Sequence, residues 1–229
     1  MCFFVSFGKG FHFFVEIQRI LGGINMENLV QKTLAALEQH AFQTAHFASL
    51  EEAVDWMNGQ IPDGASVGVG GSVSVRSSGL LERLAERGIE ILDHWKPELS
   101  AEDKKELFYR TQRVDAYLCS ANAVTADGCI LNVDGMGNRL AAHCYGPKRL
   151  YLLVGINKLV ADVSAALDRI EKVAPINCQR KGFDTPCTKT GECCDCNSPD
   201  RSCRAYLLLR RPTRAVPVTV VLVDQELGF

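Results

Sequence analysis

The sequence lacks an excess of charge of either sign. Its 229 residues carry 25 lysines and arginines against 27 aspartates and glutamates, which gives a formal net charge of -2. A chain without a basic surplus has no long-range attraction to polyanions, so we do not expect nucleic acid as a partner. The composition, 47% hydrophobic and 23% charged, is that of a globular chain large enough to bury a core.

Long uninterrupted apolar runs are also lacking. The stretch at residues 1–25 is rich in Phe, but Gly8, Lys9 and other small or charged residues interrupt it. It is too short and broken to span a bilayer, and it lacks the features of a signal peptide, so we expect no membrane span and a cytoplasmic protein. A cleanly amphipathic segment begins at Met26. We therefore expect residues 1–25 to be a leader upstream of the true start, or else an arm that is loosely ordered or contacts a membrane surface.

Nucleotide-binding motifs are missing from the most glycine-rich loop, VGVGGSVSV, which fits neither G-x-G-x-x-G nor the phosphate loop that ends in G-K-S/T. The strand before it delivers Gly70 and Gly71 at its carboxyl end, where the absence of Cβ atoms lets the backbone approach a ligand. Ser72 and Ser74 add hydroxyl groups. A helix beginning near Ser77 would favour an anion. The alternative interpretation is a plain tight turn.

Hydrophobic periodicity predicts an α/β fold, with a mostly parallel sheet flanked by helices on both faces. Ser49 followed by Glu52 forms a capping-box pattern, and Ser100 is a further expected N-cap. Helices are expected over 27–40, from 50, around 80–88, over 101–110 and over 161–173, where Val163, Leu167 and Ile170 would face inward; strands are expected over 42–47, 65–69, 89–92, 114–120, 129–133, 149–154, 204–209 and 219–223. The last strand is expected to join the main sheet.

The segment from Asn122 to Arg139 concentrates polar side chains among glycines, a composition typical of a ligand-lining loop. Asp134 is a candidate general base, and Arg139 a candidate clamp for carboxylate or phosphate, because a guanidinium pairs with either in a bidentate way. Turns built by Asp and Asn beside Gly are the plainer alternative for any single residue. The candidate ligand-binding residues of this segment are Asp127, Asn132, Asp134, Asn138 and Arg139.

The stretches GVGGSVSV, ADGCILNVDGMGNRLAA and GPKRLYLLVGINKLV resemble the lactate-utilisation (LUD) domain, formerly a domain of unknown function, from about Met26 onward. The resemblance implies a fold similar to ribose-5-phosphate isomerase and the CoA transferases, whose relatives bind phosphosugars or acyl-CoA. It also implies that Gly70 to Ser72 form the ligand loop, and that Asp127 with Asn132 forms a second wall. No glutamate stands where a CoA transferase keeps its nucleophile, so acyl transfer is not expected. The family name implies lactate or 2-hydroxy acid metabolism beside iron–sulfur oxidoreductase subunits.

A polar, turn-rich segment over 177–204 has no helical or strand period and holds six of the ten cysteines, five of them between Cys187 and Cys203. Cys193 and Cys196 have the C-x2-C spacing with which two thiolates bind one metal ion. We expect a metal-binding excursion that holds either a cubane iron–sulfur cluster (4Fe-4S) or zinc. The alternatives are a reduced loop without metal, or a disulfide between Cys193 and Cys196. The predicted ligands are Cys187, Cys193, Cys196 and Cys203.

His94 and Trp95 are lesser candidates because they follow a strand at its carboxyl end, where open α/β sheets bind ligands. A linker residue and a peripheral core aromatic are the plainer interpretation. Two functions therefore stand side by side: binding of a small anionic metabolite in a glycine-rich cleft, and service as an iron–sulfur or zinc accessory subunit. The sequence leaves open whether the chain is an enzyme, and whether it forms a homo-oligomer.

Overall fold

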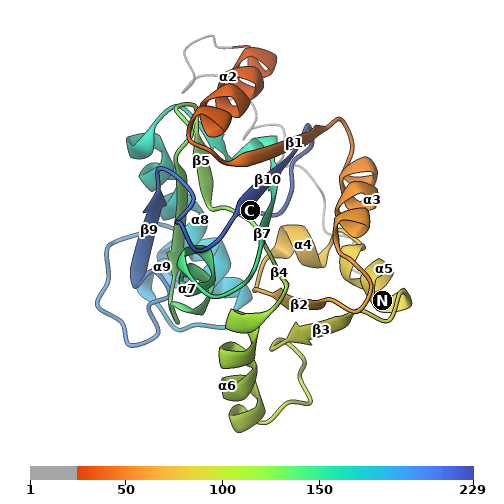
Figure 1. Cartoon of the computed structure of the whole chain (residues 1–229). Helices are drawn as coiled ribbons and strands as arrows, with labels where there is room; N and C mark the ends of the chain where they lie inside the picture. Colours follow the sequence, from red (N-terminus) through yellow and green to blue (C-terminus); the bar gives the residue numbers. More distant parts are fainter. Residues whose placement is uncertain (1–24) are drawn as a thin grey trace, which may run out of the picture.

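The computed structural model describes residues 25–229, which form two β-sheets and the helices that pack on them (Figure 1). The prediction of a leader or arm over residues 1–25 lies outside the described residues, apart from Asn25. That residue caps the first described helix by accepting a hydrogen bond from the backbone N–H of Glu27 at 3.2 Å.

The main sheet has six parallel strands in the order β1-β10-β7-β4-β2-β3. This arrangement confirms the predicted α/β class and the mostly parallel sheet, including the return of the last strand to it. The strands are β1 (Gln43–Phe47), β2 (Ser66–Val69), β3 (Glu90–Asp93), β4 (Ala116–Cys119), β7 (Leu150–Gly155) and β10 (Val218–Val223).

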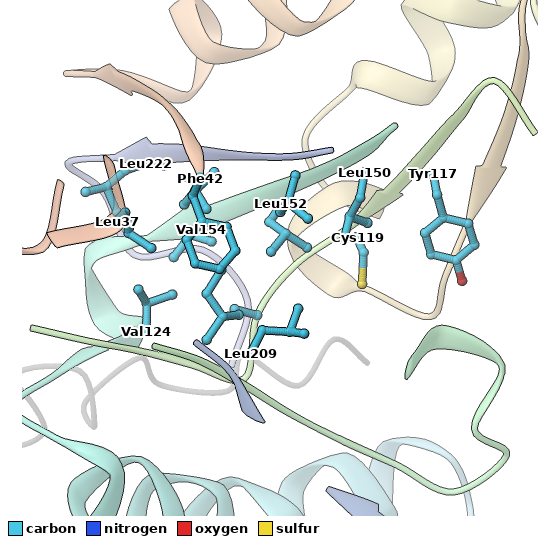
Figure 2. Packing of buried hydrophobic residues seen from close by; sticks show 14 of the residues in the cluster. Leu37, Phe42, Tyr117, Cys119, Val124, Leu150, Leu152, Val154, Leu209 and Leu222 are labelled. Carbon is cyan, nitrogen blue, oxygen red and sulfur yellow. The ribbon is translucent and has the colours of Figure 1, made fainter. Parts of the chain in front are cut away.

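Strand β7 shows how the sheet is buried on both faces. All six of its residues are buried, as a continuous apolar run in a parallel sheet requires. Leu150, Leu152 and Val154 belong to one core, and Tyr151 and Leu153 belong to the core on the opposite face. Figure 2 shows the first of these cores. The alternation fixes the register of β7, because a shift of one residue would exchange the two sets.

A second sheet covers one face of the main sheet, and sequence patterns did not predict it. Its order is β8-β5-β6-β9, with β5 paired to β6 antiparallel and to β8 parallel. Val124 of β5 and Leu209 of β9 join the core that contains Leu152 (Figure 2). The strands are β5 (Ala123–Thr125), β6 (Ile130–Asp134), β8 (Leu159–Val160) and β9 (Ala205–Leu209).

The helices complete the layers. α3, α4 and α5 cover one face of the main sheet, α2 and the second sheet cover the other, and α8 packs on the outer side of the second sheet. The predicted flanking helices are thus confirmed. The described helices are α2 (Met26–Gln39), α3 (Leu50–Gln60), α4 (Val73–Arg76), α5 (Leu80–Glu86), α6 (Ala101–Arg110), α7 (Asn138–Cys144), α8 (Val163–Arg180) and α9 (Pro186–Thr190), with short 3-10 turns η1 (Thr111–Arg113) and η2 (Ile156–Lys158).

The two predicted N-caps, Ser49 and Ser100, are confirmed. Ser49 caps α3 with the predicted box, in which its hydroxyl accepts from the Glu52 backbone and the Glu52 carboxylate accepts from the Ser49 backbone. Ser100 caps α6 by accepting a hydrogen bond from the backbone of Asp103 at 3.0 Å. Each such cap stabilises its helix by about 1 kcal/mol.

The end of α8 was predicted wrongly. The helix does not stop near residue 173 but runs through Pro175 to Arg180. Proline usually breaks a helix because it lacks an N–H group, but here the helix continues, and Ala174, Pro175 and Cys178 are buried. The expectation that Leu167 faces inward is also wrong, since it is 41% exposed. The cysteine-rich excursion therefore begins after α8, and it contains the short helix α9.

Candidate functional site

A cavity of about 470 Å³ opens at the carboxyl end of the main sheet. The loop after β2 contributes Gly71, and the segment after β3 contributes His94 and Trp95. The start of α7 contributes Arg139, and the last turn of α8 contributes Arg180. Carboxyl ends of parallel strands are where open α/β sheets bind their ligands, so this cavity is the candidate site.

The structure brings the glycine-rich loop together with part of the segment from Asn122 to Arg139, but not with Asp127 and Asn132, the residues expected to form the second wall. Gly71 lines the cavity beside Asp134, Asn138 and Arg139 from the second predicted segment. Gly70 lies directly behind: a Cβ atom built on it would be 3.2 Å from the Tyr117 hydroxyl and 3.7 Å from Cδ of Arg139. The two segments are far apart in the sequence: Gly71 follows β2 of the main sheet, whereas Asp134 to Arg139 lead from β6 of the second sheet into α7.

Gly71 is where the absence of a side chain matters most. A Cβ atom at this position would lie 2.8 Å from Cζ2 of Trp95, closer than carbon atoms approach each other in proteins. The glycine therefore lets the indole ring lie against the loop. The carbonyl of Gly71 also accepts a hydrogen bond from Nη2 of Arg180 at 3.4 Å.

Ser72 and Ser74 lie behind the cavity wall. Ser72 is 7% exposed and caps α4 by accepting from the backbone of Val75 at 3.4 Å. Ser74 is buried and donates to the carbonyl of Leu227 at 3.1 Å. No helix starts at Ser77: α4 begins earlier, at Val73, and spans one turn only, and the helix expected around Leu80 begins there as α5. So short a helix provides little dipole for an anion.

Two further predicted residues lie away from the cavity. Asp127 accepts a hydrogen bond from the Thr125 hydroxyl within the turn between β5 and β6. Asn132 is 1% exposed, and its Oδ1 accepts from the backbone of Asn122 at 3.1 Å while its Nδ2 lies 3.3 Å from Nδ1 of His143. Both side chains therefore make hydrogen bonds within the segment that forms β5 and β6 of the second sheet.

Asp134 lines the cavity with both carboxylate oxygens engaged. Oδ1 accepts from the backbone of Gly135 at 2.8 Å, and Oδ2 accepts from the backbone of Arg139 at 3.1 Å. These bonds hold the turn that leads into α7, where Gly137 has a left-handed φ of 83°. The role of general base that the sequence suggested for Asp134 would require one of these bonds to be released.

Arg139 is anchored by the segment that precedes it. Its Nη2 donates to the carbonyl of Val133 and, at 2.9 Å, to Oδ1 of Asn122. The backbone carbonyl of Asn122 in turn accepts from Nη1 of Arg169, a second arginine that is only 8% exposed. Asn122 therefore ties two arginines together at the cavity wall.

Arg180 is the main residue that the sequence analysis missed. Its guanidinium carbon lies 4.9 Å from the centre of the Trp95 ring, and that of Arg76 lies 5.1 Å from the same ring. Arg76 forms a bidentate ion pair with Asp93, at 2.9 and 2.5 Å. Arg180, by contrast, has no carboxylate partner within residues 25–229. Its Nε is buried and makes no hydrogen bond within the same range. Lys181 lines the cavity next to it.

His94 contributes an imidazole to the same wall. Its ring lies 4.6 Å from that of Phe108, and its Nδ1 is buried without a hydrogen-bond partner among the described residues. Burial lowers the pKa of His94, against an opposing effect of the neighbouring Asp93 carboxylate. The imidazole is therefore neutral at neutral pH.

A buried lysine that the sequence patterns did not single out lies behind the loop. Nζ of Lys158 donates to the hydroxyls of Ser74 and Ser120, each at 2.8 Å. Lys158 is 3% exposed, and burial, with a smaller effect of the Arg169 guanidinium, lowers its pKa to about 7. The signal that could have located it is Asn157-Lys158 directly after the buried strand β7.

The cysteine-rich segment reaches the cavity through Cys203. Arg201 holds this segment by donating to the carbonyl of Cys196 at 2.7 Å and to that of Cys203 at 2.9 Å. Cys187 is buried, and its sulfur lies 3.1 Å from the hydroxyl of Thr185. Within residues 25–229, no group of three or more His, Cys, Asp or Glu side chains is arranged to hold a metal ion.

Residues 25–229 contain no helix that is both long and apolar enough to cross a membrane.

Comparisons with known proteins give one family model and a similar solved structure. The family model of the LUD domain matches residues 30–223. The crystal structure of a DUF162 family protein from Deinococcus radiodurans superimposes with a TM-score of 0.54 at 14% sequence identity, and the match covers 88% of this chain and 99% of that one. At this identity the likeness concerns the fold alone. No curated protein matches the chain.

Proposed function

The chain belongs to the LUD-domain family, and we propose that it binds a small anionic metabolite, a carboxylate or a phosphate ester, in the cavity beside Arg139 and Arg180. The observation that supports this proposal best is the convergence of three cationic side chains on one cavity. Arg139, Arg180 and Lys181 line it together with a single carboxylate, that of Asp134.

The charges of these walls are not balanced from within the described residues. Asp134 uses both oxygens on backbone N–H groups, and Arg180 has no carboxylate partner. Lys158 and Arg169 add two buried cations behind the wall, and the charge of Arg169 opposes protonation of Lys158. A guanidinium binds carboxylate or phosphate through paired, charge-assisted hydrogen bonds, so an anion is the ligand that this site favours.

The size of the cavity suits a small metabolite. About 470 Å³ lies within the range of pockets that hold small ligands. The family name suggests lactate or a related 2-hydroxy acid, and we place the metabolite in that class on this basis. The described cysteines are free thiols, which favours a reducing compartment, and we place the protein in the cytoplasm.

Thermal-shift screening with phosphosugars, CoA esters and 2-hydroxy acids tests the proposal. We expect at least one class to raise the melting temperature of the wild type, and Arg180→Met to abolish that increase. The matched control is Arg83→Met, which removes an arginine from a surface ion pair with Asp55 on α3. An unchanged response of Arg180→Met, or silence of the wild type toward every class, would refute an anion site at this place.

We also propose a metal centre at Cys187, Cys193, Cys196 and Cys203, as a cubane iron–sulfur cluster or as zinc. The observation in favour is that Cys203 contacts the cavity while neighbouring thiols share its segment. Binding would require the segment to close, because the thiols are not gathered around one point. In this second function the chain is an accessory or electron-transfer subunit that docks on iron–sulfur oxidoreductase subunits.

Metal analysis after anaerobic purification distinguishes the two metals. A cluster gives a brown protein with visible absorbance, and zinc gives a colourless protein with stoichiometric metal. Cys196→Ser should lose either, whereas Cys144→Ser, on the half-buried end of α7, should keep it. A protein that carries no metal under these conditions would refute this second function and leave the anion site untouched.

A further inference from the structure

His94 is placed for a role beyond anion binding. It follows β3 at the carboxyl end of the main sheet and lines the same cavity as Arg139 and Arg180. Its ring packs against Phe108 at 4.6 Å and approaches Trp95 at 6.5 Å, so its position is fixed by aromatic neighbours. Its Nδ1 is shielded from solvent and makes no hydrogen bond within residues 25–229.

The cavity offers few other groups for proton exchange. Among its carboxylate, thiol and imidazole side chains, Asp134 has both oxygens bound to backbone N–H groups. Lys181 also lines the cavity, and burial lowers the pKa of its ammonium group. His94 is the imidazole of the cavity, the side-chain type whose unperturbed pKa lies closest to neutrality, and its Nδ1 makes no hydrogen bond within residues 25–229.

The charges that face His94 determine its state in the free protein. Asp93 and Asp134 favour the imidazolium, whereas Arg76, Lys104 and burial oppose it, and the net effect lowers the pKa of His94. Asp93 has only partial influence because it is already paired with Arg76. An anion in the cavity would add the negative charge that the protonated ring lacks.

We propose that His94 is the acid–base residue of this cavity: it takes up a proton when an anion binds, and it donates that proton to an oxygen atom of the bound ligand. In that step an N–H bond of the imidazolium breaks, an O–H bond forms on the ligand, and the imidazole returns to its neutral state. The step needs no oxidant, reductant or second substrate. This inference rests on the proposed anion site and adds proton transfer to the bound ligand.

Proton uptake and anion binding must be linked in both directions. If the anion favours the imidazolium, then protonation of His94 strengthens anion binding by the same factor. An anion a few ångströms from the ring gives a coupling on the order of tenfold. Sulfate is the suitable probe, because it does not itself titrate near neutral pH.

The test is the affinity for sulfate at about pH 5.5 and at about pH 8.5, on either side of the histidine range. We expect the wild type to gain on the order of tenfold more affinity at the lower pH than His94→Gln does. The two proteins should bind sulfate equally at the higher pH, where His94 is neutral. Lys158→Met should keep the contribution of His94, although Lys158 itself titrates in this range.

Each outcome identifies what has failed. If His94→Gln gains as much affinity at low pH as the wild type, or if the gain disappears in Lys158→Met instead, the inference about His94 is overturned while the anion site stands. If the wild type does not bind sulfate, and Arg180→Met behaves in the same way, both the inference and the proposed function fail.

Discussion

Lys158 gives the sharpest test of whether burial in this fold lowers the pKa of an ammonium group. The residue is 3% exposed, and its ammonium group donates to the hydroxyls of Ser74 and Ser120. Burial lowers its pKa from the ordinary value of 10.5 to about 7. Between these two values the unfolded chain binds a proton that the folded chain has released.

The sign of the effect follows from this difference in proton binding. Because the unfolded state binds more protons, the free energy of unfolding rises with pH by about 1.4 kcal/mol per pH unit between the two pKa values of Lys158. Over the whole interval the contribution amounts to about 5 kcal/mol. It is fully gained above the unfolded pKa and is lost as the pH falls toward 7.

Lys158→Met removes this titration without orphaning its partners. Ser74 still donates to the carbonyl of Leu227, and Ser120 to that of Leu153. We therefore expect the variant to be more stable relative to wild type near neutral pH than near pH 10, with a change in the difference of about 4 kcal/mol.

Urea unfolding of both proteins at a series of pH values measures this difference. Lys105→Met, at an exposed position on α6, is the control and should run parallel to the wild type. Parallel curves for Lys158→Met and wild type would refute the reasoning, because they would show that the folded ammonium titrates like a solvated one.

Three further substitutions test the packing around the site and its frame. Gly71→Ala should destabilise the protein by about 1–3 kcal/mol, because the new methyl group meets Trp95, and Trp95→Ala should relieve much of that loss in a double-mutant cycle followed by urea unfolding. Gly128→Ala should lower the free energy of unfolding more than Gly64→Ala does. Both glycines have a left-handed φ, but only at Gly128 would the methyl group meet the backbone of α2, at 2.7 Å. Equal midpoints of the two variants in a thermal melt would contradict this. Ser49→Ala should lower the free energy of unfolding by about 1 kcal/mol through loss of the capping box, and an unchanged urea midpoint would show that the cap contributes nothing.

Local signals explain which parts of the fold the sequence could predict. The capping residues Ser49 and Ser100 act within a few residues of themselves, so their helices were predicted with nearly correct starts. The buried run of β7 lies on both cores of the sheet and reads as a strand in any context. Short-range chemistry was therefore sufficient for these elements.

The second sheet and the full length of α8 depend on contacts that a sequence does not display. β5 has three residues and β8 has two, too few for a period to be visible. Pro175 signals the end of a helix, yet α8 continues through it to Arg180. Tertiary packing outweighs local preference at this position.

Only part of the candidate site could be predicted, because some of its residues have a local sequence signal and others reach the cavity only through tertiary packing. Gly71, Asp134 and Arg139 lie in or beside glycine-rich turns whose composition is itself the signal, and the structure places all three on the cavity. Arg180 and Lys181 come from a helix end that the sequence assigned to the cysteine-rich excursion, so their convergence on Gly71 was not visible. Two of the three cations that support the proposed anion site, Arg180 and Lys181, could therefore be assigned to it only from the structure.

The location of a bound anion tests the central claim most directly. A crystal of the protein soaked with selenate would reveal the anion by the anomalous scattering of selenium. We predict that selenate lies in the cavity, in contact with the guanidinium groups of both Arg139 and Arg180. Selenate bound elsewhere on the molecule, with none between these two arginines, would contradict the account.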